Sequence, residues 1–135
     1  MDLMQFLRDR LDEDEQAARR AGDSFRQIGE TGVIVATEGD RAEECASANW
    51  AGIAEHIVRH DPARVLRDVE AKQRVLALHS TPHTVVDGFC VEDGGPCTHR
   101  GEAECTLCGE TGCTTLRLLV LPYANHPNYR DDWRP

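Results

Sequence analysis

The sequence has few aromatic residues and no long apolar run. Aromatic residues make up 5% of the 135 positions, although hydrophobic residues together reach 40%, so we expect a modest core of mainly aliphatic side chains. No stretch approaches the roughly 20 apolar residues of a membrane-spanning helix. The first ten residues also lack the basic and apolar segments of a secretory signal peptide. These absences argue against a membrane protein and favour a cytoplasmic one.

Positive charge is in the minority. The chain has 15 Lys and Arg against 24 Asp and Glu, a formal net charge of −9. Nucleic-acid binding depends on cations that neutralise phosphates, so this balance disfavours a nucleic-acid partner. The sequence contains no Gly-rich phosphate loop, nucleophile elbow or carboxylate dyad. We therefore assign no catalytic and no cofactor-binding residue.

Cysteine, by contrast, is concentrated in one segment. Five of the six cysteines lie between Cys90 and Cys113, and in a reducing compartment such clusters hold metal more often than they form disulfides. Cys105-x-x-Cys108 followed by Cys113 is a spacing that suits tetrahedral Zn²⁺, which needs a fourth ligand. The candidates for that ligand are His79, His83, Cys90, Cys97 and His99. The alternatives to a structural zinc are a disulfide framework, free reduced thiols and redox use.

Helical periodicity dominates the first 80 residues. Asp2 and Gln5 form a capping-box-like start, and apolar residues then recur in steps of three and four from Met4 to Ile28. The seam of this first helix faces either the core or a second copy, in a homodimer. Further helices are predicted over residues 50–60, 61–79 and 114–121, the second of them capped at Asp61-Pro62. One strand is predicted over residues 31–37, and Cys45 is expected to be a small buried residue.

These elements predict a mainly α protein with a minor β element, a small α+β fold whose helical domain is closed by a structural zinc site. We expect a single domain over residues 1–135. Residues 1–80 form a helical body with a strand near 31–37, and residues 81–122 a Cys-rich zinc-binding module with a short helix. Residues 123–135 form an aromatic C-terminal tail, which either folds back on the protein or docks a partner.

Two other groups of residues carry weaker functional hypotheses. His56 and His60 are four residues apart on a predicted helix, where they could chelate a metal, but their Glu-His-x-x-x-His order lacks the internal glutamate of a metalloprotease helix. A basic face would support nucleic-acid binding. Its candidate residues are Arg59, Arg64, Arg67, Lys72 and Arg74.

Three blocks of the chain resemble an uncharacterised family of actinobacterial and actinophage proteins, a domain of unknown function (6221). The blocks are residues 7–18, 56–72 and 115–135. The resemblance covers nearly the whole chain except the loops, and it implies a complete small protein with no known activity. It also implies a regulatory role in a phage or mobile-element setting.

The resemblance also bears on the metal ligands. It implies a Cys-x-x-Cys and a third cysteine just before a helix, which Cys105, Cys108 and Cys113 match. Family members usually have proline after the third cysteine, and Thr114 departs from this without harm to a helix start. Residues 81–98 look longer than is usual in the family. That length favours His79 over Cys90 as the fourth ligand.

We therefore expect a small cytoplasmic zinc-stabilised protein that acts as a non-enzymatic protein-binding, adaptor or regulatory module. The seam of the first helix and the aromatic tail are its expected contact surfaces. The alternative is a zinc-dependent nucleic-acid-binding protein. A metal-dependent enzyme using His56 and His60 is a third, less favoured hypothesis.

Overall fold

A computed structural model describes residues 1–79, 85–86, 89–90, 95–96 and 113–135. The chain divides into two compact units. We call residues Leu11–Ala71 the sheet unit, and Met1–Arg10 with Lys72–Pro135 the terminal unit. Helix α1 (Leu3–Arg20) and helix α3 (Pro62–His79) each contribute residues to both.

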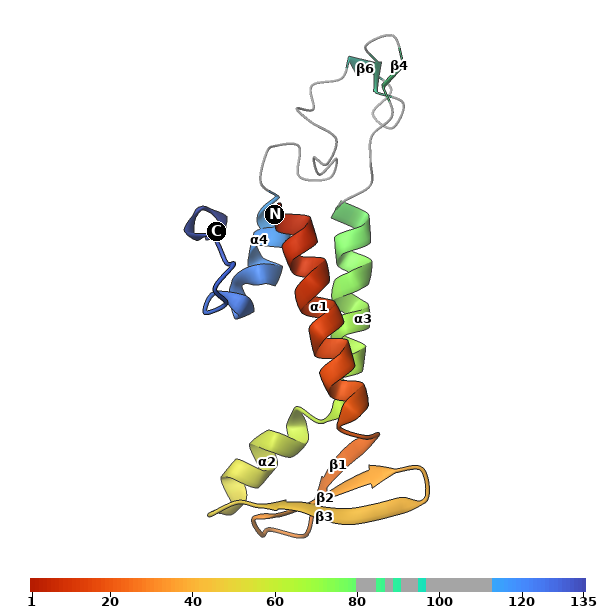
Figure 1. Cartoon of the computed structure of the whole chain (residues 1–135), viewed down its shortest axis with the longest axis vertical. Helices are drawn as coiled ribbons and strands as arrows, with labels where there is room; N and C mark the ends of the chain where they lie inside the picture. The colour runs from red at the N-terminus through yellow and green to blue at the C-terminus, as the bar shows by residue number, and fades with distance from the viewer. Residues whose placement is uncertain (80–84, 87–88, 91–94, 97–112) are drawn as a thin grey trace. The chain divides into compact units, whose positions relative to one another are not determined.

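The sheet unit contains a three-stranded antiparallel sheet. Its strands are β1 (Ser24–Gln27), β2 (Val33–Glu38) and β3 (Arg41–Ser47), in the order β1-β2-β3. Helix α2 (Ala51–Arg59) packs against β1 and β2 and covers one face of the sheet (Figure 1). Ile34 of β2 and Ala54 of α2 are both fully buried. The core of this unit therefore lies between α2 and one sheet face.

Two local features set where this sheet begins. Gly22, at a φ of +108°, follows the end of α1 in a conformation that side chains with a Cβ rarely adopt, and the next amide, Asp23 N–H, donates to Thr37 O at 2.8 Å. At the start of α3, Asp61 accepts hydrogen bonds from Arg64 N–H at 2.9 Å and from Phe25 N–H at 3.3 Å. One carboxylate thus caps α3 and anchors β1.

The terminal unit is built on the first turns of α1 and the last turns of α3. Helix α4 (Thr114–Val120) and two short 3-10 helices, η1 (Leu121–Tyr123) and η2 (Asp131–Trp133), complete its described helical part. Phe6, Leu7, Leu116 and Val120 form its most deeply buried core. The unit also contains a small antiparallel sheet in the order β4-β5-β6, formed by β4 (Val85–Val86), β5 (Phe89–Cys90) and β6 (Gly95–Pro96).

The helices predicted from local signals are confirmed. Gln5 N–H donates to Asp2 Oδ1 at 2.8 Å at the start of α1, and α2, α3 and α4 lie within two residues of their predicted bounds. The predicted strand is confirmed as β2. None of the described helices combines the length and the apolar character needed to cross a bilayer.

The predicted fold class is wrong. The protein is a small α+β structure whose described residues form four α-helices and a three-stranded antiparallel sheet, β1 to β3, so β structure is no minor element. The first helix ends at Arg20, because Gly22 turns the chain, and Phe25 lies in a strand instead. Among the described residues, no group of three or more His, Cys, Asp or Glu could hold a metal ion. The structure therefore shows no helical domain closed by zinc.

Candidate functional site

The end of α3 and the start of α4 bring two predicted metal ligands together. His79 is the last residue of α3, and Cys113 immediately precedes α4. His79 Nδ1 lies 3.2 Å from Cys113 Sγ, although 34 positions separate the two residues. Cys113 is 4% exposed, and its carbonyl accepts a hydrogen bond from Arg117 N–H at 3.0 Å. The thiol is thus held at the edge of the core by the first turn of α4.

This pair fits the first coordination shell of zinc. Zn–S bonds of about 2.3 Å and Zn–N bonds of about 2.0 Å at a tetrahedral angle place the two donor atoms about 3.5 Å apart. The observed 3.2 Å is within a few tenths of an ångström of that separation. It is also the distance of a hydrogen bond that involves sulfur. Thiol and imidazole together are a donor pair that Zn²⁺ prefers.

The remaining predicted ligands cannot be placed beside this pair. Cys105 and Cys108 lie outside the described residues, as do Cys97, His83 and His99. Cys90 lies in β5, where the structure describes the backbone and not the side chains. The ligand set that includes Cys105 and Cys108 therefore stays a prediction.

Cys45 differs from its prediction. It is exposed and not buried, as is every residue of the edge strand β3. The β-bulge between Ile34 and Val35 of β2 also leaves Cys45 without a cross-strand partner. It lies in the sheet unit, whereas His79 and Cys113 lie in the terminal unit.

His56 and His60 do lie together at the end of α2. Their ring centres are 4.5 Å apart, and His60 Nδ1 lies 2.8 Å from the carbonyl oxygen of His56. Both side chains are exposed. Of the two, only His60 lines the nearby pocket of about 230 Å³, whose walls include Asp14, Phe25 and otherwise apolar residues. An enzyme would need both imidazoles and a carboxylate around one cavity, and this pocket does not provide that.

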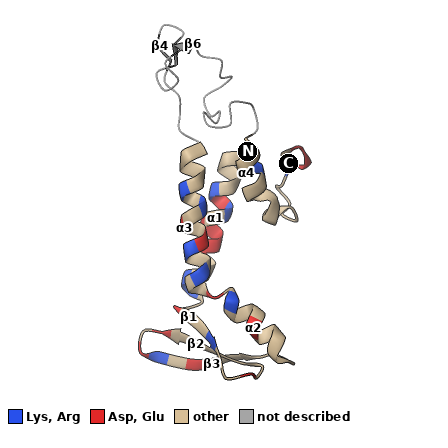
Figure 2. Cartoon of the chain, turned by 180° about the vertical axis from the view of Figure 1, so that it is seen from behind, with Lys and Arg blue, Asp and Glu red and all other residues tan. Residues whose placement is uncertain are grey.

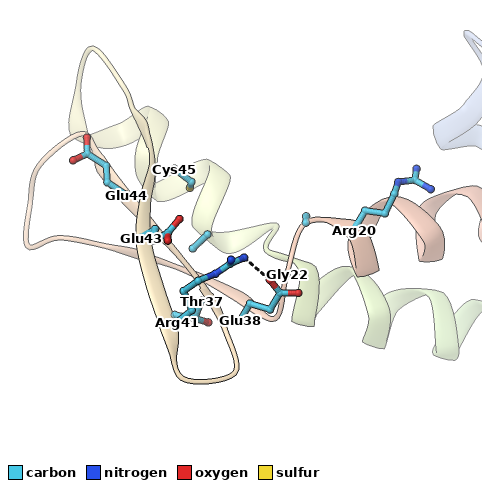
Figure 3. A pocket seen from close by; sticks show the side chains of 10 residues that line it. Arg20, Gly22, Thr37, Glu38, Arg41, Glu43, Glu44 and Cys45 are labelled. Atoms are coloured by element: carbon cyan, nitrogen blue, oxygen red, sulfur yellow. Dashed lines mark hydrogen bonds and ion pairs between the residues drawn. The ribbon is translucent and has the colours of Figure 1, made fainter.

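A second pocket lies where the end of α1 meets the β2–β3 hairpin (Figure 3). It has a volume of about 270 Å³ and is lined by Arg20, Glu38, Arg41, Glu43 and Cys45 among others. Arg41 and Glu38 form an ion pair across it at 2.7 Å. Both of these side chains are more than 60% exposed, so solvent screens the pair. The lining residues include no imidazole to act as a base.

Two of the five predicted basic residues have an acidic partner on their own helix. Arg59 pairs with Glu55 at 2.9 Å, and Arg64 approaches Asp68 to 3.9 Å. Figure 2 shows acidic and basic residues interspersed along α1 and α3. Interspersed charges are typical of a solvated helix surface and give little field for a phosphate backbone.

The aromatic tail folds back onto the first helix. Phe6 of α1 is fully buried. The centre of its ring lies within 6.5 Å of the ring centres of four residues of the tail. These partners are Tyr123, His126, Tyr129 and Trp133. The nearest ring centre is that of Trp133, at 5.0 Å.

Met4, Leu7 and Leu11, the first residues of the predicted seam, are also buried within the chain. Phe6 and Arg10 were missed as tail contacts, because they lie beside the seam and not in it.

These features define a small α+β protein in which a histidine and a cysteine, His79 and Cys113, meet at a helix junction. The family model described as "Family of unknown function (DUF6221)" matches residues 1–135. The chain therefore belongs to this family, as its sequence blocks indicate. Neither the curated proteins nor the solved structures contain a match.

Proposed function

We propose that the chain is a cytoplasmic zinc-binding module that acts through protein contacts and not through catalysis. The observation that carries the proposal is the 3.2 Å approach of His79 Nδ1 to Cys113 Sγ. Cys105 and Cys108 form the Cys-x-x-Cys pair that precedes Cys113 in the sequence. With His79 and Cys113 they make a set of four ligands of the kind that binds Zn²⁺.

The chemistry of this ligand set favours a stabilising ion. Three thiolates and one imidazole fill all four tetrahedral positions, so no position is open for water or substrate. When bound, zinc supplies folding free energy, because the unfolded chain does not hold its ligands in place. His79 and Cys113 would anchor the ion to α3 and α4. A reducing compartment, which keeps clustered thiols available for metal, fits this role.

Charge and exposed apolar surface support protein contacts over nucleic-acid contacts. The formal net charge is −9, which disfavours phosphate binding. Leu118 of α4 and Leu121, the first residue of η1, are 54% and 40% exposed, and residues three apart share one side of a helix. Such apolar surface is suited to a protein partner. A regulatory role in a phage or actinobacterial setting belongs to the same proposal, on the resemblance of its sequence blocks alone.

The test is zinc content by elemental mass spectrometry on the purified full-length chain. We expect one zinc per chain, lost in Cys113→Ser and Cys108→Ser and reduced in His79→Ala. Cys45→Ser is the matched control, because Cys45 is an exposed cysteine of the other unit, and it should keep its zinc. Circular dichroism on each sample shows whether helicity falls with the metal. A carefully reduced wild type without zinc, or a Cys113→Ser variant that retains it, contradicts the proposal.

A further inference from the structure

The two faces of the β1-β2-β3 sheet have different surroundings. Ile34 lies on the face that α2 covers and is fully buried. Gln27, its partner in the β1–β2 register, donates from Nε2 to Ala51 O of α2 at 3.2 Å. Because side chains alternate along a strand, the residues between them point to the other face. Figures 1 and 2 show no element of the sheet unit, all of whose residues are described, over that second face.

This uncovered face has an apolar centre. Val33 and Val35 lie on it along the middle strand β2, and both are half-buried. Ile28 N–H donates to Val33 O at 3.0 Å, so Ile28 continues the β1 register beside Val33, and it is 42% exposed. The solvent side of an antiparallel sheet normally carries polar residues. A continuous apolar strip there marks a contact surface.

Two residues of opposite charge flank this strip, one on each neighbouring strand. In the sheet register Val35 pairs with Arg26 of β1 on one side and with Glu44 of β3 on the other. The strands are about 4.8 Å apart, so the two charged residues stand about 10 Å from each other across Val35. Figure 3 shows Glu44 and Glu43 pointing to opposite sides of β3. Across the described part of the chain, neither the Arg26 nor the Glu44 side chain has a hydrogen-bonded or ionic partner.

We infer that this uncovered face binds the same face of a second copy of the chain. A two-fold axis parallel to β2 places Val35 over Val35 of the second copy, and places Arg26 opposite Glu44 on both sides. An axis perpendicular to β2 instead places Arg26 opposite Arg26 and Glu44 opposite Glu44, which is repulsive. The charge pattern thus selects aligned sheet packing through one self-complementary patch.

A second copy of the chain is thus the partner in the protein contacts of the proposed function. The dimer rests on that proposal of protein contacts and does not depend on bound zinc. Three short strands offer less than the roughly 800 Å² per partner of a typical stable interface. The dimer is therefore expected to be weak and to depend on concentration. Opposed charges at such an interface mainly fix which alignment forms.

The test is sedimentation equilibrium of the full-length chain over a wide concentration range. The mass of the wild type should rise from the 15.0 kDa of one chain towards twice that value. The single reversals Arg26→Glu and Glu44→Arg each set like charges opposite one another, and should weaken association by about tenfold or more. The double variant Arg26→Glu with Glu44→Arg exchanges the two signs and should restore association.

Glu43→Arg is the matched control, because it makes the same charge change on the other side of β3 (Figure 3) and should associate like the wild type. Circular dichroism of each variant confirms that the fold is intact. A wild type that stays monomeric, single reversals without effect, or a double variant that fails to recover would each overturn the inference. Zinc content is measured on the same samples. A monomeric wild type that holds its zinc therefore overturns the dimer and leaves the metal site standing.

Discussion

Arg10 Nη1 lies 2.8 Å from Nε2 and 3.1 Å from Nδ1 of His126, although 116 positions separate the two residues. Arg10 is 7% exposed, and its guanidinium carbon lies 5.0 Å from the centre of the Phe6 ring. The imidazole of His126 contacts the same Phe6 ring edge-on, with ring centres 5.5 Å apart. The tail is thus joined to α1 by a hydrogen bond and by ring packing at once.

Substitutions at His126 separate these two contributions. His126→Phe keeps a ring against Phe6 but removes the ring nitrogens that contact Arg10 and accept from Asn128 N–H, so we expect a loss of about 1–2 kcal/mol in the free energy of unfolding. His126→Ala removes both contacts and should lose about 2–4 kcal/mol. Urea unfolding followed by circular dichroism measures both, with the exposed neighbour Asn125→Ala as control. Equal losses in the two variants would show that the ring packing contributes nothing, and a His126→Phe variant as stable as the wild type would show that the hydrogen bond contributes nothing.

Trp133 should be the most sensitive residue of the tail. It is 6% exposed and packs against Phe6 and Tyr129, so Trp133→Ala is expected to destabilise the protein by about 3–5 kcal/mol. Arg134→Ala is the adjacent control. Its ion pair with Asp131 is exposed, and its loss should change the free energy of unfolding by less than about 1 kcal/mol. Similar effects of the two variants in urea unfolding would contradict the docked tail.

Gly22 and Gly39 test two turns of the sheet unit, the one between α1 and β1 and the one between β2 and β3. Both have positive φ, but a Cβ at Gly22 would lie 2.9 Å from Thr37 O, whereas one at Gly39 would meet nothing within 4 Å. Gly39→Ala should therefore lose only the conformational cost, about 1 kcal/mol. Gly22→Ala adds a backbone clash and should lose about 2–3 kcal/mol. Thermal and urea unfolding rank the two variants. A larger loss of stability in Gly39→Ala than in Gly22→Ala would contradict the backbone conformation of Gly22 at the end of α1.

The exposure of two cysteines predicts their reactivity. Cys45 is exposed on β3, and Cys113 is buried at the start of α4. Iodoacetamide applied to the native, reduced protein should modify Cys45 and spare Cys113, because alkylation requires an accessible thiolate. Peptide mass spectrometry identifies both sites, and labelling in urea provides the fully modified reference. Native modification of Cys113 as fast as that of Cys45 would contradict its burial.

The helices were predictable because their signals are local. Asp2 and Asp61 each cap a helix within three residues, and both bonds are present. Strand β1 was not predicted, because Phe25 and Ile28 continue the apolar spacing of three and four residues that is typical of α1 beyond Gly22. Strand β3 has small and charged residues and no buried side chain, so composition gives no strand signal. It is held by its backbone pairing with β2, which only the folded hairpin provides.

The sequence names candidate metal ligands but does not give their positions in the fold. The spacing of Cys105, Cys108 and Cys113 indicates a metal, but several residues competed for the fourth position. The choice of His79 depends on where α3 ends relative to α4, and spacing along the chain does not encode that placement. Phe6 as the tail's docking site and Arg10 as a buried cation likewise follow from tertiary packing alone.

The central claim is that His79 and Cys113 bind one zinc ion together with Cys105 and Cys108. Zinc X-ray absorption spectroscopy of the purified full-length chain tests it most directly, because it counts sulfur and nitrogen neighbours of the metal. We predict three sulfur atoms at about 2.3 Å and one nitrogen at about 2.0 Å, with the nitrogen lost in His79→Ala. A shell of four sulfur atoms would show that the fourth ligand is another cysteine and not His79. A shell of oxygen and nitrogen alone would contradict the account.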